Sequence, residues 1–218
     1  MTEEERRERL IKWLHDIKRE VEHLLVSEYL FWELQKIVSE NDKFRDASGL
    51  FTRWIADGFK QSSMMAVRRQ VKLNDASISL RGFLEEIKSF PELVSRQYYM
   101  SLYEGQQRNV MHMGERDFDN LAGTDTDRLP AGLLEQQITE LSRSAEGIEE
   151  FADRRVAHFD RREPAQPFPT FDDLTAAIKV QEKLVILYWR LLKGASMTTL
   201  LPAIIFDWQD VSRFAWKP

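Results

Sequence analysis

The sequence contains no cysteine among its 218 residues. Disulfide bonds, thiolate metal sites and a cysteine nucleophile are therefore excluded, which leaves the four histidines as the scarce side chains for proton transfer. Glycine and proline are also scarce, with nine and seven residues. Because β-sandwiches and β-barrels need many turns, this scarcity favours a helical fold.

Long apolar runs and an excess of positive charge are absent too. The longest apolar runs, 184–189 and 200–206, are far shorter than the ~20 residues of a membrane-spanning helix. Residues 1–7 hold no apolar stretch of the kind found in a secretory signal, so we expect a cytoplasmic protein without membrane contact. The net charge of −5 excludes a chain that coats nucleic acid through its overall charge, and any such contact must be local.

The composition is that of a folded domain. Hydrophobic residues make up 43% of the chain and charged residues 31%, so it can bury a core. The apolar residues recur every three or four positions over long stretches, which is the period of an amphipathic helix. We therefore predict an all-α fold, a compact bundle of about six to seven helices in which residues 1–218 form a single domain.

The N-terminal third is predicted to form long helices. Thr2 and Glu5 form a capping box, in which each side chain satisfies a backbone amide of the first turn. The apolar period then runs to Val38, as one bent helix or as two. After the polar residues 39–48, a further helix reaches about Val71. Its apolar residues occupy nearly every side, so we expect it at the centre of the bundle.

Capping and turn residues divide the rest of the chain. Ser79 and Pro91 begin two shorter helices, and Pro130 begins a long amphipathic one. Thr170 forms a second capping box with the residue three positions later, and this helix ends at Gly194, a residue suited to a helix C-terminus.

Three segments lack a helical pattern. Glycines and aspartates interrupt the period over 105–128, where we expect a long loop. Three prolines in 160–170 predict an extended connector. The residues after Gly194 are expected to form a short aromatic tail packed on one end of the bundle, through Phe206, Trp208, Phe214 and Trp216.

Arg154 and His158 form the most informative pair. On an α-helix of about 3.6 residues per turn they lie one turn apart, beside the apolar stripe that contains Ile148 and Ala152. A guanidinium holds phosphate oxygens and an imidazole that titrates near neutrality moves protons, so the pair could act on a phosphodiester. Alternatively, His158 packs beside Phe151 and bonds a carbonyl, and Arg154 is a solvated charge.

Other candidates are weaker. Arg155 faces nearer the apolar stripe, where its charge needs a carboxylate partner or a subunit interface. Arg68 and Arg69 lie late in their helix, where structural ion pairs and phosphate contacts are both open. All three are candidate substrate-binding residues. Glu20 and His23 match one Glu-x-x-His element of di-iron bundles, but no second element exists, so we expect no metal and no cofactor.

Several blocks in order along the chain carry a family resemblance. They are Val67–Val71 with Ser77–Leu80, Asp153–Asp160, Pro169–Leu174, Asp207–Trp208 and Phe214–Trp216. Together they resemble the AbiU-like branch of the HEPN superfamily. The resemblance implies a compact helical bundle, usually a homodimer, that is associated in prokaryotes with abortive infection and toxin–antitoxin systems.

Active members of the superfamily resemble one another in a metal-independent ribonuclease mechanism. The 2′-hydroxyl of RNA attacks the adjacent phosphate, a histidine moves protons, and an arginine stabilises the phosphoryl charge in a groove shared by two protomers. By this resemblance His158 is the general acid and base and Arg154 is the phosphate clamp. The implied partners are a second copy, an RNA substrate and an antitoxin-like protein.

The arginine spacing departs from the superfamily pattern. That pattern separates the arginine from the histidine by four to six residues, and residues 151–153 hold no arginine. Only three residues separate Arg154 from His158. Either Arg154 substitutes, or Arg68 or Arg69 reaches the site, or the domain is a catalytically inactive module for binding and dimerisation.

Overall fold

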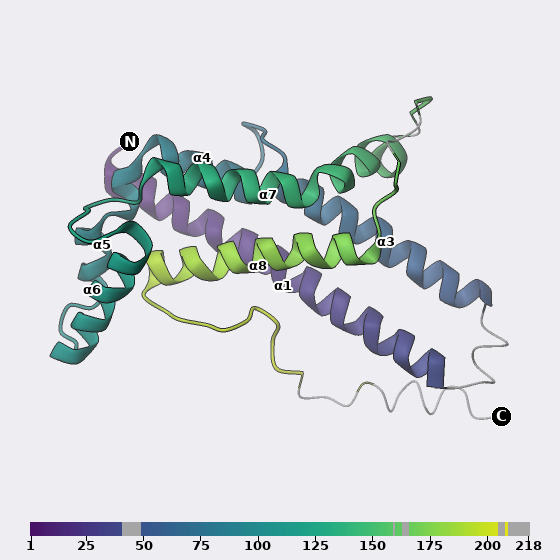
Figure 1. Ribbon diagram of the computed structural model, residues 1–218, viewed down its shortest axis with the longest axis horizontal. Helices are drawn as coiled ribbons and strands as arrows, with labels where there is room; N and C mark the ends of the chain where they lie inside the picture. Colours follow the sequence, from purple (N-terminus) through teal and green to yellow (C-terminus); the bar gives the residue numbers. More distant parts are fainter. Residues whose placement is uncertain (41–48, 159, 163–165, 205–207, 209–218) are drawn as a thin grey trace.

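The computed structural model describes residues 1–40, 49–158, 160–162, 166–204 and 208. Within these residues the chain forms seven α-helices, a short 3₁₀ helix and a short π-helix, with no β-strand. The predicted all-α bundle is therefore confirmed (Figure 1). In chain order the elements are α1 (Glu3–Glu40), α3 (Gly49–Val71), α4 (Leu80–Ser89), η1 (Pro91–Val94), α5 (Arg96–Ser101), α6 (Arg108–Ala122), α7 (Ala131–Phe151), η2 (Ala152–Ala157) and α8 (Phe171–Lys193).

The first helix is single and long. The hydroxyl of Thr2 accepts a hydrogen bond from the Glu5 amide at 3.2 Å, and the Glu5 carboxylate accepts one from the Thr2 amide at 2.7 Å, which confirms the capping box. Ser27 does not divide the helix, because its hydroxyl donates to the carbonyl of His23 at 2.7 Å and leaves the helical backbone in place.

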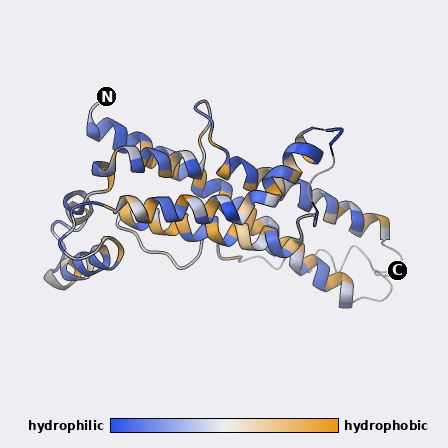
Figure 2. Ribbon diagram, turned by 45° about the horizontal axis from the view of Figure 1, so that its top comes forward, coloured by the Kyte–Doolittle hydropathy of each residue, from blue (hydrophilic) through white to orange (hydrophobic). Residues whose placement is uncertain are grey.

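α8 is the central helix of the bundle. It packs against α1, α3 and α7, and Figure 2 shows hydrophobic residues concentrated along it. Its buried residues occupy several sides: Leu174, Ala177, Ile178, Gln181, Leu184, Val185, Tyr188, Leu191 and Leu192. The hydroxyl of Tyr188 donates to the side-chain oxygen of Gln137 at 2.5 Å, so this polar pair is satisfied inside the core.

The expectation that α3 is central is wrong for its first half. Leu50 is 85% exposed and Trp54 70% exposed, and burial begins only at Ser63. The N-terminal half of α3 extends past the end of α8 alongside the C-terminal half of α1 (Figure 1). A helix that is apolar on every side is usually buried on every side, but the first half of α3 extends past the helices that would cover it.

The loop predicted over 105–128 is also wrong, because α6 occupies most of it. Phe118 and Ala122 are buried on its inner face. Gly114 interrupts the apolar period, and its place is explained by packing: a Cβ there would lie 3.1 Å from the ring of Tyr103. The segment predicted as one helix from Pro91 is divided at Ser95, whose hydroxyl caps α5 by accepting from the Tyr98 amide at 3.2 Å.

The boundaries of α4 and α8 follow the predicted signals. Ser79 caps α4 by accepting from the Gly82 amide at 3.0 Å. Thr170 and Asp173 form the predicted capping box, and Gly194 ends α8 in the left-handed region. Of the Pro-rich connector, residues 160–162 and 166–170 are described and none is helical. Phe206, Phe214 and Trp216 of the predicted tail lie outside the described residues. No helix in the described part of the chain is both long and apolar enough to cross a bilayer.

Gly194 is expected to be intolerant of a side chain. Its φ is +64°, and an added Cβ would lie 3.3 Å from the Cβ of Leu102. We expect Gly194→Ala to lower the free energy of unfolding by about 1–2 kcal/mol, measured by urea denaturation followed by circular dichroism. Gly58→Ala is the control, because Gly58 is helical and has no atom near the added Cβ; it should raise stability by about 0.5–1 kcal/mol. Equal effects of the two substitutions would contradict this explanation.

Candidate functional site

The segment with the predicted site residues is a π-helix. α7 ends at Phe151, and the chain continues with the wider turn of η2 through Ala157. His158 then adopts an extended conformation, with φ −136° and ψ 153°. The expected α-helical stacking of Arg154 and His158 is therefore wrong, because His158 lies beyond the helix. π-helical turns are rare in proteins, and those that do occur often lie at functional sites.

Asp153 joins η2 to α3. Nε of Arg68 donates to Oδ1 of Asp153, and Nζ of Lys72 donates to Oδ2 at 3.0 Å. Lys72 also lies 3.2 Å from the carboxylate of Glu149 at the end of α7. Arg68 of α3 and Lys72, the residue directly after α3, are thus held against the end of α7 and the start of η2, and we call this arrangement the Asp153 bridge.

The bridge changes the titration of its members. Partial burial opposes ionisation of Asp153, but the hydrogen bonds from Lys72 and Arg68 and their positive charges outweigh it and lower the pKa of Asp153 from its ordinary value. Hydrogen bonds to Asp153 and Glu149 raise the pKa of Lys72. Asp153 and Lys72 are therefore both charged at neutral pH.

The remaining residues of η2 are held by local contacts. The guanidinium of Arg154 lies 3.1 Å from the carboxylate of Glu150, one turn earlier. Nη1 of Arg155 donates to the backbone carbonyl of Asp160 at 3.0 Å, which is a polar partner but not the carboxylate or subunit interface expected from its predicted position near the stripe. The amide of Asp160 donates to the carbonyl of Arg154 at 3.0 Å, which closes the chain around His158.

The imidazole of His158 is exposed. Among the described residues it accepts or donates no hydrogen bond, so the alternative in which it bonds a carbonyl is not supported. Phe151 instead packs edge-on against Phe168, with ring centroids 5.5 Å apart, and lies beneath Nζ of Lys60 at 5.1 Å. The imidazole is therefore available to a molecule approaching from solvent.

Arg68 and Arg69 point to different parts of the molecule. Consecutive helical residues differ by about 100° in direction, so only one of them can face η2. Arg68 joins the Asp153 bridge, whereas the guanidinium of Arg69 lies 3.2 Å from Glu20 on α1. The structure thus groups Arg68 with the η2 segment and separates Arg69 from it. Lys72 was missed by the sequence reasoning, although its spacing of four from Arg68 places both on one helix face.

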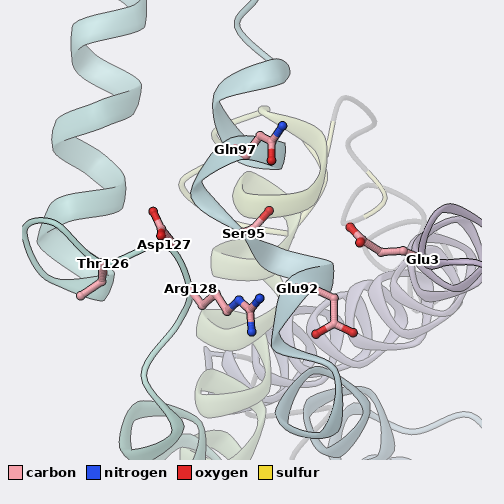
Figure 3. A pocket seen from close by; sticks show the side chains of 7 residues that line it. All are labelled: Glu3, Glu92, Ser95, Gln97, Thr126, Asp127 and Arg128. Carbon is pink, nitrogen blue, oxygen red and sulfur yellow. The ribbon is translucent and has the colours of Figure 1, made fainter.

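A cavity of about 700 Å³ lies at the opposite end of the bundle, where η1 and α5 meet the segment after α6 (Figure 3). Its lining residues are Glu3, Glu92, Ser95, Gln97, Thr126, Asp127 and Arg128. Three carboxylates and a single guanidinium line it, so the excess of negative charge makes it unsuited to a phosphate chain. Within the described ranges no group of three or more histidine and carboxylate side chains is placed to hold a metal ion.

The fold and the site define a helical bundle with an exposed histidine at a cation-rich turn. A family model described as AbiU2, of the HEPN type, matches residues 7–215. The chain therefore belongs to the AbiU2 family of HEPN domains, which confirms the predicted resemblance and makes it a HEPN domain of the kind associated with abortive infection. No curated protein and no solved structure matches the chain.

The Asp153 bridge should make stability depend on pH. Because the pKa of Asp153 is lower in the folded chain than in the unfolded chain, its contribution is present above about pH 4 and is lost as the pH falls through the folded value. Wild type should therefore be more stable than Asp153→Asn at neutral pH, and the difference should shrink toward about pH 2, as measured by urea unfolding.

A matched background isolates the bridge in this experiment. In a Lys72→Gln chain, which has lost one of the two cations, the same Asp153→Asn substitution should give a smaller pH-dependent difference. A difference that stays constant with pH in the wild-type background would contradict the assignment of the lowered pKa to this carboxylate.

Proposed function

We propose that the chain is a metal-independent endoribonuclease of a prokaryotic abortive-infection or toxin–antitoxin system, acting in the cytoplasm as a homodimer. Family membership supports the biological setting. The observation that carries the chemistry is the η2 turn, where Arg68 of α3 bonds Asp153 and Arg154 belongs to the turn that leads into the exposed His158. That combination suits a negatively charged substrate whose reaction needs proton transfer.

His158 would move both protons of the reaction. It takes the proton of the 2′-hydroxyl as the 2′-oxygen attacks phosphorus, and it returns a proton to the 5′-oxygen as the P–O5′ bond breaks. The products are a 2′,3′-cyclic phosphate and a 5′-hydroxyl, so neither water nor a metal ion is consumed. An exposed imidazole can approach a bound strand without rearrangement of the bundle.

Arg68 is well placed to replace the missing arginine. Its guanidinium bonds Asp153, which stands at one of the positions where the superfamily pattern has arginine. A positive group from α3 therefore reaches the turn from which that arginine would project. We assign the phosphate clamp to Arg68 together with Arg154, and to Arg155 the role of holding the chain around His158 through Asp160.

A second copy would strengthen the site. The chain is acidic overall, so one η2 turn offers RNA a small cationic area. Two turns facing one groove double that area without changing the net charge per residue. Leu50 and Trp54, largely exposed on α3, are apolar surface of the kind that subunit interfaces or an antitoxin-like partner bury.

The second candidate function is a catalytically inactive module for binding and dimerisation. The observation that favours it is the Asp153 carboxylate, which lies between Arg68 and Lys72 and would repel a phosphate. In that case the bridge is a structural clamp, and the domain acts through a protein partner.

Cleavage of RNA separates the two candidates. The purified chain should cut RNA in the presence of EDTA and leave 2′,3′-cyclic phosphate ends, identified by mass spectrometry of the products. His158→Ala should lower the rate by about 10²–10⁴-fold, because general acid–base catalysis is lost. His112→Ala, at an exposed histidine of α6, is the matched control and should keep the wild-type rate. Full activity in His158→Ala would refute the catalytic assignment.

Binding of RNA should distinguish the two neighbouring arginines. Arg68→Gln should weaken binding of a 2′-O-methyl RNA, which cannot be cleaved, by about tenfold or more, because a charge-assisted contact is lost. Arg69→Gln should have little effect, since that guanidinium faces α1. Fluorescence anisotropy at fixed salt measures both. Equal losses of RNA affinity in the two variants would contradict RNA binding at the face of α3 that carries Arg68.

A further inference from the structure

A second polar site lies between α1 and α3, on the side of α3 that faces away from η2. It is a pocket of about 180 Å³, and we call it the α1–α3 pocket. Its lining residues are Glu20, His23, Leu24 and Ser27 from α1, and Ser62, Ser63, Ala66 and Arg69 from α3. The proposed ribonuclease chemistry uses none of these side chains. The pocket therefore needs an explanation of its own.

Ser63 is the most informative residue of the pocket. It is 1% exposed, and its hydroxyl has no hydrogen-bond partner within the described ranges. The two neighbouring serines behave differently: Ser27 donates to the carbonyl of His23 at 2.7 Å, and Ser62 donates to the carbonyl of Phe59 at 3.1 Å. Because buried hydroxyls nearly always have a partner and Ser63 lines the pocket, a group bound there would supply that partner.

The carboxylate in the pocket is held on both oxygens. Oε2 of Glu20 accepts from Nε2 of Gln70 at 2.5 Å, and Oε1 lies 3.2 Å from the guanidinium of Arg69. Gln70 is itself buried, and its oxygen accepts from the Leu80 amide at 2.9 Å. This network fixes Glu20 and compensates its charge, and it orients Arg69 at the rim of the pocket. A guanidinium has five N–H donors, so one contact with Glu20 leaves others for a ligand.

The lining groups select a particular ligand chemistry. The hydroxyl of Ser63, the guanidinium of Arg69 and the imidazole of His23 can donate hydrogen bonds. The oxygens of Ser27 and Ser62, whose protons are already donated, can accept them. A hydrogen phosphate group has the complementary set, because its anionic oxygens accept and its P–OH donates. Sulfate has no proton at neutral pH and matches only the donors; a monoester, whose second pKa is about 6, has lost most of its P–OH there and also relies mainly on the donors.

We propose that the α1–α3 pocket binds a phosphate group, either as inorganic phosphate or as the phosphate of a monoester. The pocket volume suits the phosphate alone. Since His23, Ser27 and Arg69 are exposed at its rim, the organic part of a monoester would extend into solvent. The site is separate from η2, so it binds phosphate whether or not the chain cleaves RNA.

Isothermal titration calorimetry of the full chain tests the proposal. Inorganic phosphate, titrated at neutral pH and constant ionic strength in chloride, should show saturable binding, and sulfate should bind more weakly. Ser63→Ala and Arg69→Gln should each lower the affinity by about tenfold or more. Arg128→Gln, at the opposite end of the bundle, should leave it unchanged. Ser63→Ala removes only one oxygen, so it tests the site even if Arg69→Gln unfolds the chain.

A nucleoside monophosphate distinguishes the two sources of the phosphate. It should displace inorganic phosphate from the pocket, with higher affinity if the natural ligand is a monoester and with equal affinity if it is the free ion. Absence of saturable phosphate binding would overturn the proposal. So would wild-type affinity in folded Ser63→Ala or folded Arg69→Gln. The test measures binding through Ser63 and Arg69 and no cleavage, so failure of the ribonuclease proposal leaves it intact.

Discussion

The ionic bridge from Asp153 to Arg68 of α3 and to Lys72, just after that helix, is the interaction on which the candidate site depends. α7 is held to the bundle by buried residues as far as Ala152, and the bridge begins at the next residue. It places Arg68 and Lys72 beside the π-helical turn that leads to His158. The same carboxylate that gathers these cations also neutralises part of their charge. One side chain therefore both holds these cations in place and weakens their attraction for a phosphate.

Paired charges are a general property of this region. Arg154 is paired with Glu150, Lys72 with Glu149 as well as Asp153, and Arg162 with Asp160. In an acidic chain this pairing limits the long-range attraction of RNA, and phosphate oxygens must compete with carboxylates for the guanidinium groups. A groove between two copies would offset that competition by presenting two sets of cations. The acidic composition and a nucleic-acid substrate are compatible on this condition.

Local signals in the sequence predicted where most helices begin, but they did not predict the places where the chain departs from a regular α-helical pattern. Capping side chains at Thr2, Ser79 and Thr170 fix helix starts through bonds to neighbouring amides, so they are visible in the sequence. α6 was missed because Gly114, required by the Tyr103 ring, interrupts its apolar period. The π-helix was missed because periodic analysis assumes the α-helical turn, and the positions of Arg154 and His158 were misjudged for the same reason. Which of Arg68 and Arg69 faces η2 depends on long-range packing that the sequence pattern does not contain.

The central claim is that the imidazole of His158, next to the Asp153 bridge, meets the RNA backbone. Nuclear magnetic resonance of the ring protons of all four histidines, during titration with a non-cleavable 2′-O-methyl RNA, tests this contact directly. The account predicts that the His158 resonances shift with saturation while those of His15 and His112 stay in place. Saturable RNA binding that leaves the His158 resonances unmoved would contradict it.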